Sequence, residues 1–202
     1  DQTGKTTSDN VTIFVGVPNT LPSCSIITPA TNGASPIGQL IEFAASATDP
    51  DIPDNLLTVT WHSDKDGQIG ESTPSSNGEV VFSFANLSMN THAITMQVED
   101  EAGALCTDVI SYTVAIPPSV TIDSPGSGNT FDQGSLLTFS AQVSDNEDLP
   151  ENMAIEWALE DGTILSTDNA DSTGSVTLST SDLVMGQHIV TLTVTDSHGL
   201  SS

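Results

Sequence analysis

A long internal repeat constrains this sequence more than any other feature. The stretch Ala47–Trp61 (ATDPDIPDNLLTVTW) returns as Val143–Trp157 (VSDNEDLPENMAIEW), with acids and a Pro ahead of a segment that ends in Trp. Trp61 and Trp157 are 96 residues apart, and the same spacing links Phe43 to Phe139, Asp49 to Asp145, His92 to His188, Val98 to Val194, Asp100 to Asp196 and Gly103 to Gly199. The chain therefore contains one structural unit written twice.

Short segments in which every second residue is apolar fill each unit, which is the pattern of half-buried strands. In the first unit we expect strands at Ser23–Thr28, Leu40–Thr48, Leu57–His62, Glu79–Phe84, Thr91–Glu99 and Asp108–Ala115. In the second unit we expect them at Leu136–Val143, Met153–Leu159, Ser175–Thr180 and Gln187–Thr195. The run SDKDGQIG at 63–70 is expected to be a polar turn. Strands at this spacing, in a unit close to the size of an immunoglobulin-type (Ig-like) sandwich, predict an all-β fold of tandem Ig-like antiparallel β-sandwiches.

The repeat also sets the expected domain boundaries. We predict that residues 1–16 are the closing strand of a preceding or neighbouring Ig-like unit, 17–116 are sandwich 1, and 117–202 are sandwich 2 lacking its own closing strand. A window cut from a longer tandem array is the favoured explanation, because 1–7 and 196–202 are two versions of one loop. The alternative is strand donation, in which 9–16 of one molecule complete the open sandwich of the next.

The charge balance excludes several classes of partner. The 202 residues carry 27 acids against two Lys or Arg residues, for a formal net charge of −25. Nucleic acid binding rests on Lys and Arg that neutralise phosphates, so no nucleic acid partner is expected. No apolar run is long enough to span a bilayer, so no membrane insertion is expected in this segment. Repulsion on this scale destabilises a compact state unless cations or salt screen it.

Both cysteines, Cys24 and Cys106, lie in the first unit. Their counterparts 96 residues later are Val120 and Ser202, so the pair is absent together from the second unit. The first and last strands of a sandwich start at the same end of the domain, so we predict a Cys24–Cys106 disulfide and an oxidising compartment. The alternative is two unrelated buried thiols.

The second unit resembles the tandem Ig-like repeats of bacteria and archaea, of the PKD and cadherin-like kind. Such repeats carry an acidic loop before a strand ending in Trp, here SDNEDLPENMAIEW, and a late stretch of the form L-x-x-G-x-H-x-I-x-L-x-V-x-D-x-x-G, here LVMGQHIVTLTVTDSHG. The first unit fits this form except that Asn90 replaces the Gly. The resemblance implies a large secreted or surface-anchored protein in which the repeats serve as stalks, spacers or adhesive modules, often with bound calcium.

The acids of the repeated loop are the candidate functional residues. In this topology the loop after the second strand and the loop before the last strand lie at the same end of the sandwich. Carboxylates that converge without Lys or Arg repel one another unless a cation lies among them, and calcium takes hard oxygen ligands of this kind. The predicted calcium ligands are Asp49, Asp51, Asp54, Asp100, Asp145, Glu147, Asp148, Glu151 and Asp196. The alternative is solvated turn acids, with Asp49 and Asp145 capping the local backbone.

The other polar residues are expected to have structural roles. A second set of acids lies in the next loop of each unit and predicts polar hairpin turns: Asp64, Asp66, Glu160 and Asp161. Trp61 and Trp157 are expected in the two cores, and His92 and His188 are expected to fix a turn. No nucleophile elbow or phosphate-binding loop is present, so we do not expect an enzyme.

Together these features predict an extracellular or cell-surface structural protein. The expected function is a repeat array, either a stalk or a filament subunit, stiffened by calcium at the acidic loops and domain junctions. The expected partners are neighbouring Ig-like units of the same protein, and self-assembly into filaments is a further expectation. The alternatives are an adhesin or carbohydrate-binding module that uses the exposed loops, and an appendage of an enzyme encoded outside this segment.

Overall fold

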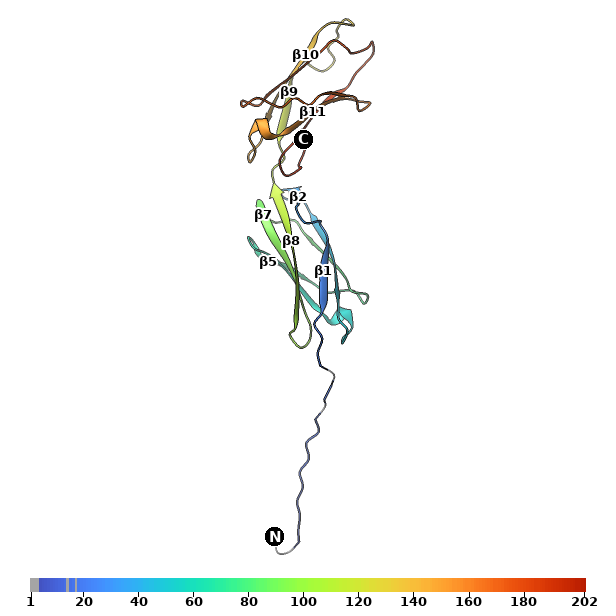
Figure 1. Ribbon diagram of the computed structural model, residues 1–202, viewed down its shortest axis with the longest axis vertical. Coiled ribbons are helices and arrows are strands. Elements are labelled where there is room, and N and C mark those ends of the chain that lie inside the picture. Colours follow the sequence, from blue (N-terminus) through green and yellow to red (C-terminus); the bar gives the residue numbers. More distant parts are fainter. Residues whose placement is uncertain (1–3, 14, 17) are drawn as a thin grey trace.

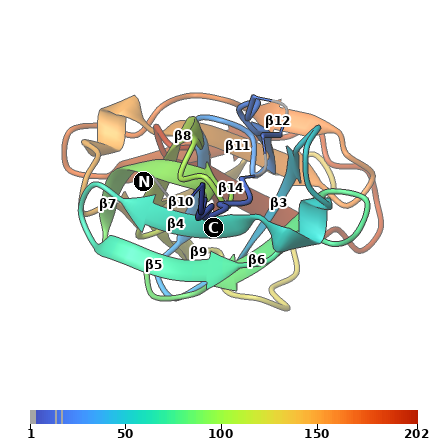
Figure 2. The ribbon, with the colours of Figure 1, turned by 90° about the horizontal axis from the view of Figure 1, so that it is seen from below.

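The computed structural model describes residues 4–13, 15–16 and 18–202, and the regular secondary structure in this part of the chain consists of strands and two short 3-10 helices. Strands β1 to β8 form one sandwich and β9 to β14 form a second, and the two follow one another along the long axis of the molecule (Figure 1). Figure 2 shows the view along this axis, with β4 and β5 side by side. Among the described residues, no helix has the length and apolar character needed to cross a membrane.

The first sandwich packs a three-stranded sheet against a five-stranded sheet. The strands are Ser23–Thr28 (β1), Gly33–Pro36 (β2), Ile41–Thr48 (β3), Thr58–Ser63 (β4), Gly67–Ser72 (β5), Glu79–Phe84 (β6), Asn90–Glu99 (β7) and Leu105–Ala115 (β8). Their order is β1-β3-β6 in one sheet and β2-β8-β7-β4-β5 in the other. Every second residue of β3 is buried, and Phe43 packs on Trp61 with ring centroids 5.3 Å apart.

The second sandwich repeats this plan with fewer strands in the described chain. Its strands are Ser119–Ser124 (β9), Leu137–Ser144 (β10), Ala154–Leu159 (β11), Ile164–Ser166 (β12), Ser175–Thr180 (β13) and Val190–Thr195 (β14). Their order is β13-β10-β9 in one sheet and β12-β11-β14 in the other. Trp157 is fully buried and packs on Phe139, with ring centroids 5.8 Å apart. Ser201 bridges Thr195 in β14, as Leu105 pairs with Glu99 in β7.

The strands predicted from apolar alternation are confirmed. The bounds of β1, β6 and β13 are those expected, and the ends of the other predicted strands move by up to three residues. The turn predicted at 63–70 is wrong in its second half, because β5 begins at Gly67. Gly70 makes this strand difficult to recognise in the sequence. The structure requires a glycine at this position, because a Cβ at Gly70 would collide with the Phe82 ring, which stacks on Trp61.

The N-terminal segment lies outside both sandwiches. Val11, Ile13 and Val15 are exposed, and the described residues before β1 are not in any strand. Residues 1–3 and 14 of the expected closing strand lie outside the described residues. Its assignment to a preceding or neighbouring unit therefore stays a prediction, as do the domain boundaries.

Candidate functional site

The acidic loop between the second and third predicted strands has the same backbone arrangement in both sandwiches. In the first, it joins β3 to β4 through a short 3-10 helix, Asp54–Leu56 (η1), and Oδ1 of Asp49 accepts the N–H groups of Asp51 and Ile52 at 2.7 and 3.1 Å. The backbone N–H of Asp49 in turn donates to Oδ1 of Asp54 at 3.1 Å. One oxygen of Asp49 thus caps the turn, as expected if Asp49 has a backbone-capping role. The other oxygen, Oδ2, is buried and has no hydrogen-bond partner in the described residues.

In the second sandwich the loop joins β10 to β11 through the 3-10 helix Pro150–Asn152 (η2). Oδ1 of Asp145 accepts the N–H groups of Glu147 and Asp148 at 2.7 and 2.8 Å. Oδ2 of Asp145 and Oε2 of Glu151 are buried without a partner among the described residues. Partial desolvation and the negative charge of Asp145 raise the pKa of Glu147 above its usual 4.5. These carboxylates therefore crowd one another.

The loop before the last strand supplies one buried carboxylate to each sandwich. Asp100 and Asp196 are only 6% and 7% exposed. Oδ1 of Asp100 accepts the N–H groups of Ala102 and Ala104 at 2.9 and 2.8 Å. Oδ1 of Asp196 accepts those of His198 and Leu200, both at 2.8 Å. One oxygen of each carboxylate thus fixes its own loop.

The two loops meet at the same end of the second sandwich, as the topology predicts. The N–H of Ser197 donates to Oδ2 of Asp148 at 2.9 Å, and this bond is the main reason that the pKa of Asp148 lies below 3.8. Carboxylate oxygens of Asp148 and Asp196 and a ring nitrogen of His198 all lie within 4.8 Å of one another. Among the described residues, this is the one group of three potential ligands placed so closely, and a metal ion fits its donor set.

The predicted ligands of the first sandwich are arranged differently. Oδ2 of Asp51 accepts the N–H of Thr20 at 2.5 Å, and Oδ2 of Asp100 accepts the side-chain amide of Asn19 at 2.7 Å. Two of the four predicted acids are therefore bonded to the segment that precedes β1. Whether any of the nine predicted residues binds calcium stays a prediction.

His198 is a potential ligand that the sequence reasoning missed. Position 198 corresponds to Ala102 in the first unit, so a search for repeated residues passes over it. Its position two residues after Asp196, in a loop expected to meet the acidic loop, was the signal that could have found it.

The linker before each sandwich touches the acidic loop of that sandwich. Thr20 donates to Asp51 in the first, and 96 residues later the backbone of Ile116 lies near enough to Glu147 to lower the pKa of that carboxyl, against the larger effects that raise it. The approach of the linker to the loop therefore recurs in both sandwiches, while the hydrogen bond belongs to the first.

The acids at the opposite end of each sandwich are turn residues, as expected. Asp64 accepts the N–H of Ala93 at 2.7 Å, and Glu160 accepts that of Ile189 at 3.0 Å, again 96 residues later. The neighbouring histidines fix the same turn from the other side. Nε2 of His92 bonds to the Ser88 carbonyl oxygen at 2.7 Å, and Nε2 of His188 bonds to the Val184 carbonyl oxygen at 2.8 Å.

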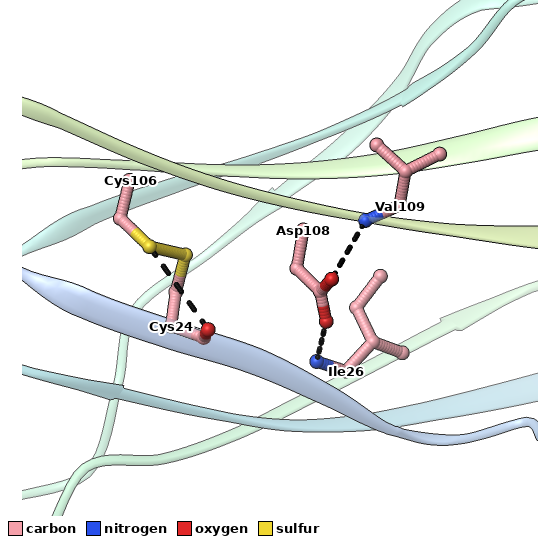
Figure 3. Close-up of a disulfide and its surroundings, with 5 residues drawn as sticks. All are labelled: Cys24, Ile26, Cys106, Asp108 and Val109. Atoms are coloured by element: carbon pink, nitrogen blue, oxygen red, sulfur yellow. Dashed lines mark hydrogen bonds between the residues drawn. A yellow bond between two sulfur atoms is a disulfide. The ribbon is translucent and has the colours of Figure 1, made fainter.

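The predicted disulfide is present and links β1 to β8 (Figure 3). The Cα atoms of Cys24 and Cys106 are 5.9 Å apart, a typical separation for bridged cysteines. A second contact ties the same two strands: Asp108 in β8 accepts the N–H of Ile26 in β1 at 2.7 Å and its neighbour Val109 at 3.0 Å (Figure 3). The alternative of two unrelated thiols is therefore wrong.

Comparison with known proteins agrees with this architecture. Residues 118–198 match the sequence model of the bacterial Ig domain family. The chain is also similar to halomucin of Haloquadratum walsbyi, with 26% identity over 133 residues, which make up 65% of this chain and 1% of halomucin. The expected resemblance to bacterial Ig-like repeats is thus confirmed.

The fibronectin(III)-like modules of CbhA from Clostridium thermocellum confirm the Ig-like sandwich fold. They align with a TM-score of 0.54 at 16% identity, over 89% of each chain, and likeness at this identity concerns the fold alone. An I-band fragment of titin aligns with a TM-score of 0.48 at 13% identity, over 90% of this chain and 62% of the fragment.

Proposed function

We propose that this chain is a segment of an extracellular structural array, a stalk or a filament subunit, with calcium bound at its acidic loops and domain junctions. The observation that carries the proposal is the pair of bonds by which the segment before β1 holds the acidic end of the first sandwich, from Thr20 to Asp51 and from Asn19 to Asp100. A linker bonded to the loops of the sandwich that follows it restrains the hinge at that junction. Such restraint suits a spacer, which must keep its extension.

Calcium is proposed because the acidic loops lack enough donors for their carboxylates. Oδ2 of Asp49, Asp145 and Asp196 is buried with no hydrogen-bond partner among the described residues. A buried acceptor left unpaired is costly, and the cost is larger for a charged group. The chain has a net charge of −25 and almost no lysine or arginine to neutralise these carboxylates. Calcium binds carboxylate oxygens of this kind.

An extracellular or cell-surface location is supported by the disulfide and by the match of residues 118–198 to the bacterial Ig domain family. Structural disulfides persist in oxidising environments and are rare in the cytosol. A non-catalytic role is proposed because the polar residues that the two units share form turns and junctions. The expected partners are further Ig-like units on either side.

Thermal unfolding in calcium, in magnesium and in chelator, all at one ionic strength, tests the proposal. Trp61 and Trp157 are fully buried, one in each sandwich, so their fluorescence in Trp157→Phe and Trp61→Phe variants follows each sandwich separately. A ligand at about 100 times its Kd adds about 2.7 kcal/mol to the stability of the state that binds it. We expect a stabilisation that is specific to calcium. An equal response to magnesium or simple salt would mean charge screening alone and would refute the calcium sites.

A further inference from the structure

The two acidic ends of this chain occupy equivalent places in the repeat but differ in the residues that surround the buried carboxylate. Asp148 corresponds to Ile52, and His198 corresponds to Ala102, so two of the three clustered ligands of the second sandwich have no counterpart in the first. Ile52 is partly buried and packs against the core of the first sandwich. The first sandwich thus holds apolar side chains where the second holds potential ligands.

In the first sandwich the buried carboxylate has a full set of donors from the protein. The Asn19 amide donates to Oδ2 of Asp100 at 2.7 Å, while Ala102 and Ala104 donate to Oδ1. The bond from Asn19 is the largest of the effects that lower the pKa of Asp100. The charge of Asp100 is therefore compensated without any ion.

In the second sandwich the corresponding donor is missing. The residue 96 positions after Asn19 is Ala115, whose side chain has no polar atom. Asp196 is more than nine-tenths buried, and its Oδ2 has no hydrogen-bond partner among the described residues. This unpaired, buried oxygen belongs to the side chain that forms the close group with Asp148 and His198. A cation is the partner that the chemistry of this group calls for.

We propose that the chain binds one divalent cation, at Asp148, Asp196 and His198 of the second sandwich, and that the Asn19 amide takes the place of that cation in the first sandwich. The proposal rests on the proposed function in placing a cation at an acidic loop, but it narrows the cation site to the acidic end of the second sandwich, and it does not depend on the array role. Two carboxylates and an imidazole suit zinc or manganese, whereas calcium prefers oxygen ligands. Further carboxylates are nearby, since Asp145 accepts the N–H of Asp148 and the charge of His198 acts on Glu147.

Isothermal titration of the chelator-treated chain with calcium, and separately with zinc, gives the number of ions bound. We expect one ion per chain from whichever metal binds. The matched variants are Asp196→Asn and Asp100→Asn, since each keeps the Oδ1 acceptor that fixes its loop. Asp196→Asn is expected to weaken binding at least tenfold, while Asp100→Asn leaves the affinity unchanged. Asp148→Asn is a second test at the same site. Trp157 fluorescence shows that the variants of the second sandwich are folded, and Trp61 fluorescence shows this for Asp100→Asn.

His198→Ala identifies the ligand chemistry. If His198→Ala no longer binds zinc, the imidazole is a zinc ligand. If His198→Ala still binds calcium, the calcium is held by oxygen ligands. Either result supports a cation in the second sandwich. Two ions per chain, or loss of the single ion in Asp100→Asn, would overturn the inference and leave the proposed calcium array standing. No binding of either metal would overturn both.

Discussion

Removal of the disulfide should destabilise one sandwich and leave the other unchanged. Cys24 and Cys106 are separated by 82 residues, so the bridge closes nearly the whole first sandwich into a loop. The loss of loop-closure entropy in the unfolded chain gives about 4.5 kcal/mol at 25 °C for a loop of this length, and measured losses for native disulfides are about 2–5 kcal/mol. The second sandwich has no bridge to lose.

The native arrangement of β1 is expected to survive without the bridge. The N–H of Ile26 still donates to Asp108, and β1 still pairs with β3 along its length. The effect should therefore act mainly on the unfolded state. Cys24→Ala with Cys106→Ala is the suitable change, because both positions pack against the core and alanine adds no polar group there.

Urea unfolding of the single-tryptophan variants separates the two sandwiches. With a urea slope of about 2 kcal/mol per molar, the expected loss moves the midpoint reported by Trp61 down by about 2 M. The midpoint reported by Trp157 should not move. An unchanged Trp61 transition, or equal shifts at both tryptophans, would refute the argument that the bridge acts by closing a loop within the first sandwich alone.

Two further predictions concern a turn glycine and a crowded acid. Gly78 has φ +78°, and an added Cβ would lie 2.9 Å from the carbonyl oxygen of Ala47, whereas at Gly162, with φ +84°, it would meet nothing within 4 Å. Gly162→Ala should therefore cost about 1–2 kcal/mol for its backbone conformation, and Gly78→Ala about 1–3 kcal/mol more, as measured by urea unfolding. The folded-state pKa of Glu147 is raised above 4.5, so ionisation of this carboxyl lowers stability as the pH rises through that window. In chelator, Glu147→Gln should therefore lose less stability than the unmodified chain between pH 4.5 and neutrality, in melts followed by the tryptophan of the second sandwich; an equal loss would contradict this.

Most of the fold could be predicted because apolar alternation and burial coincide in these strands. In β3 every buried position is one that the alternation marks, and in β4 this holds for Val59 and Trp61 but not for the buried Ser63, which was expected in the turn at 63–70. Strand β5 was not predicted, because Gly67 and Gly70 give this segment the local pattern of a turn. In the structure, Gly70 is needed because the Phe82 ring leaves no space for a larger residue. Local sequence carries no record of a ring that comes from another strand.

The candidate site could be predicted in place but not in composition. The repeat placed Asp100 and Asp196 beside the acidic loops, because both are fixed by the same topology. The side-chain amide of Asn19, which donates to Asp100, lies 81 residues before it in the sequence and outside the aligned strands. No pattern within the loop predicts this hydrogen bond. His198 was not predicted as a ligand for a different reason. Comparison of the two copies of a repeat identifies the residues that they share, and this histidine occurs in only one copy.

The bonds from Asn19 to Asp100 and from Thr20 to Asp51 also bear on how arrays of this kind can be recombined. The first sandwich and the residues just ahead of it form one transferable unit, since two of its loop acids are bonded to the segment that enters it. A chimera joined immediately before β1 would separate these acids from their donors. A junction moved a few residues upstream, ahead of Asn19, would keep both carboxylates with the donors that they have in this chain.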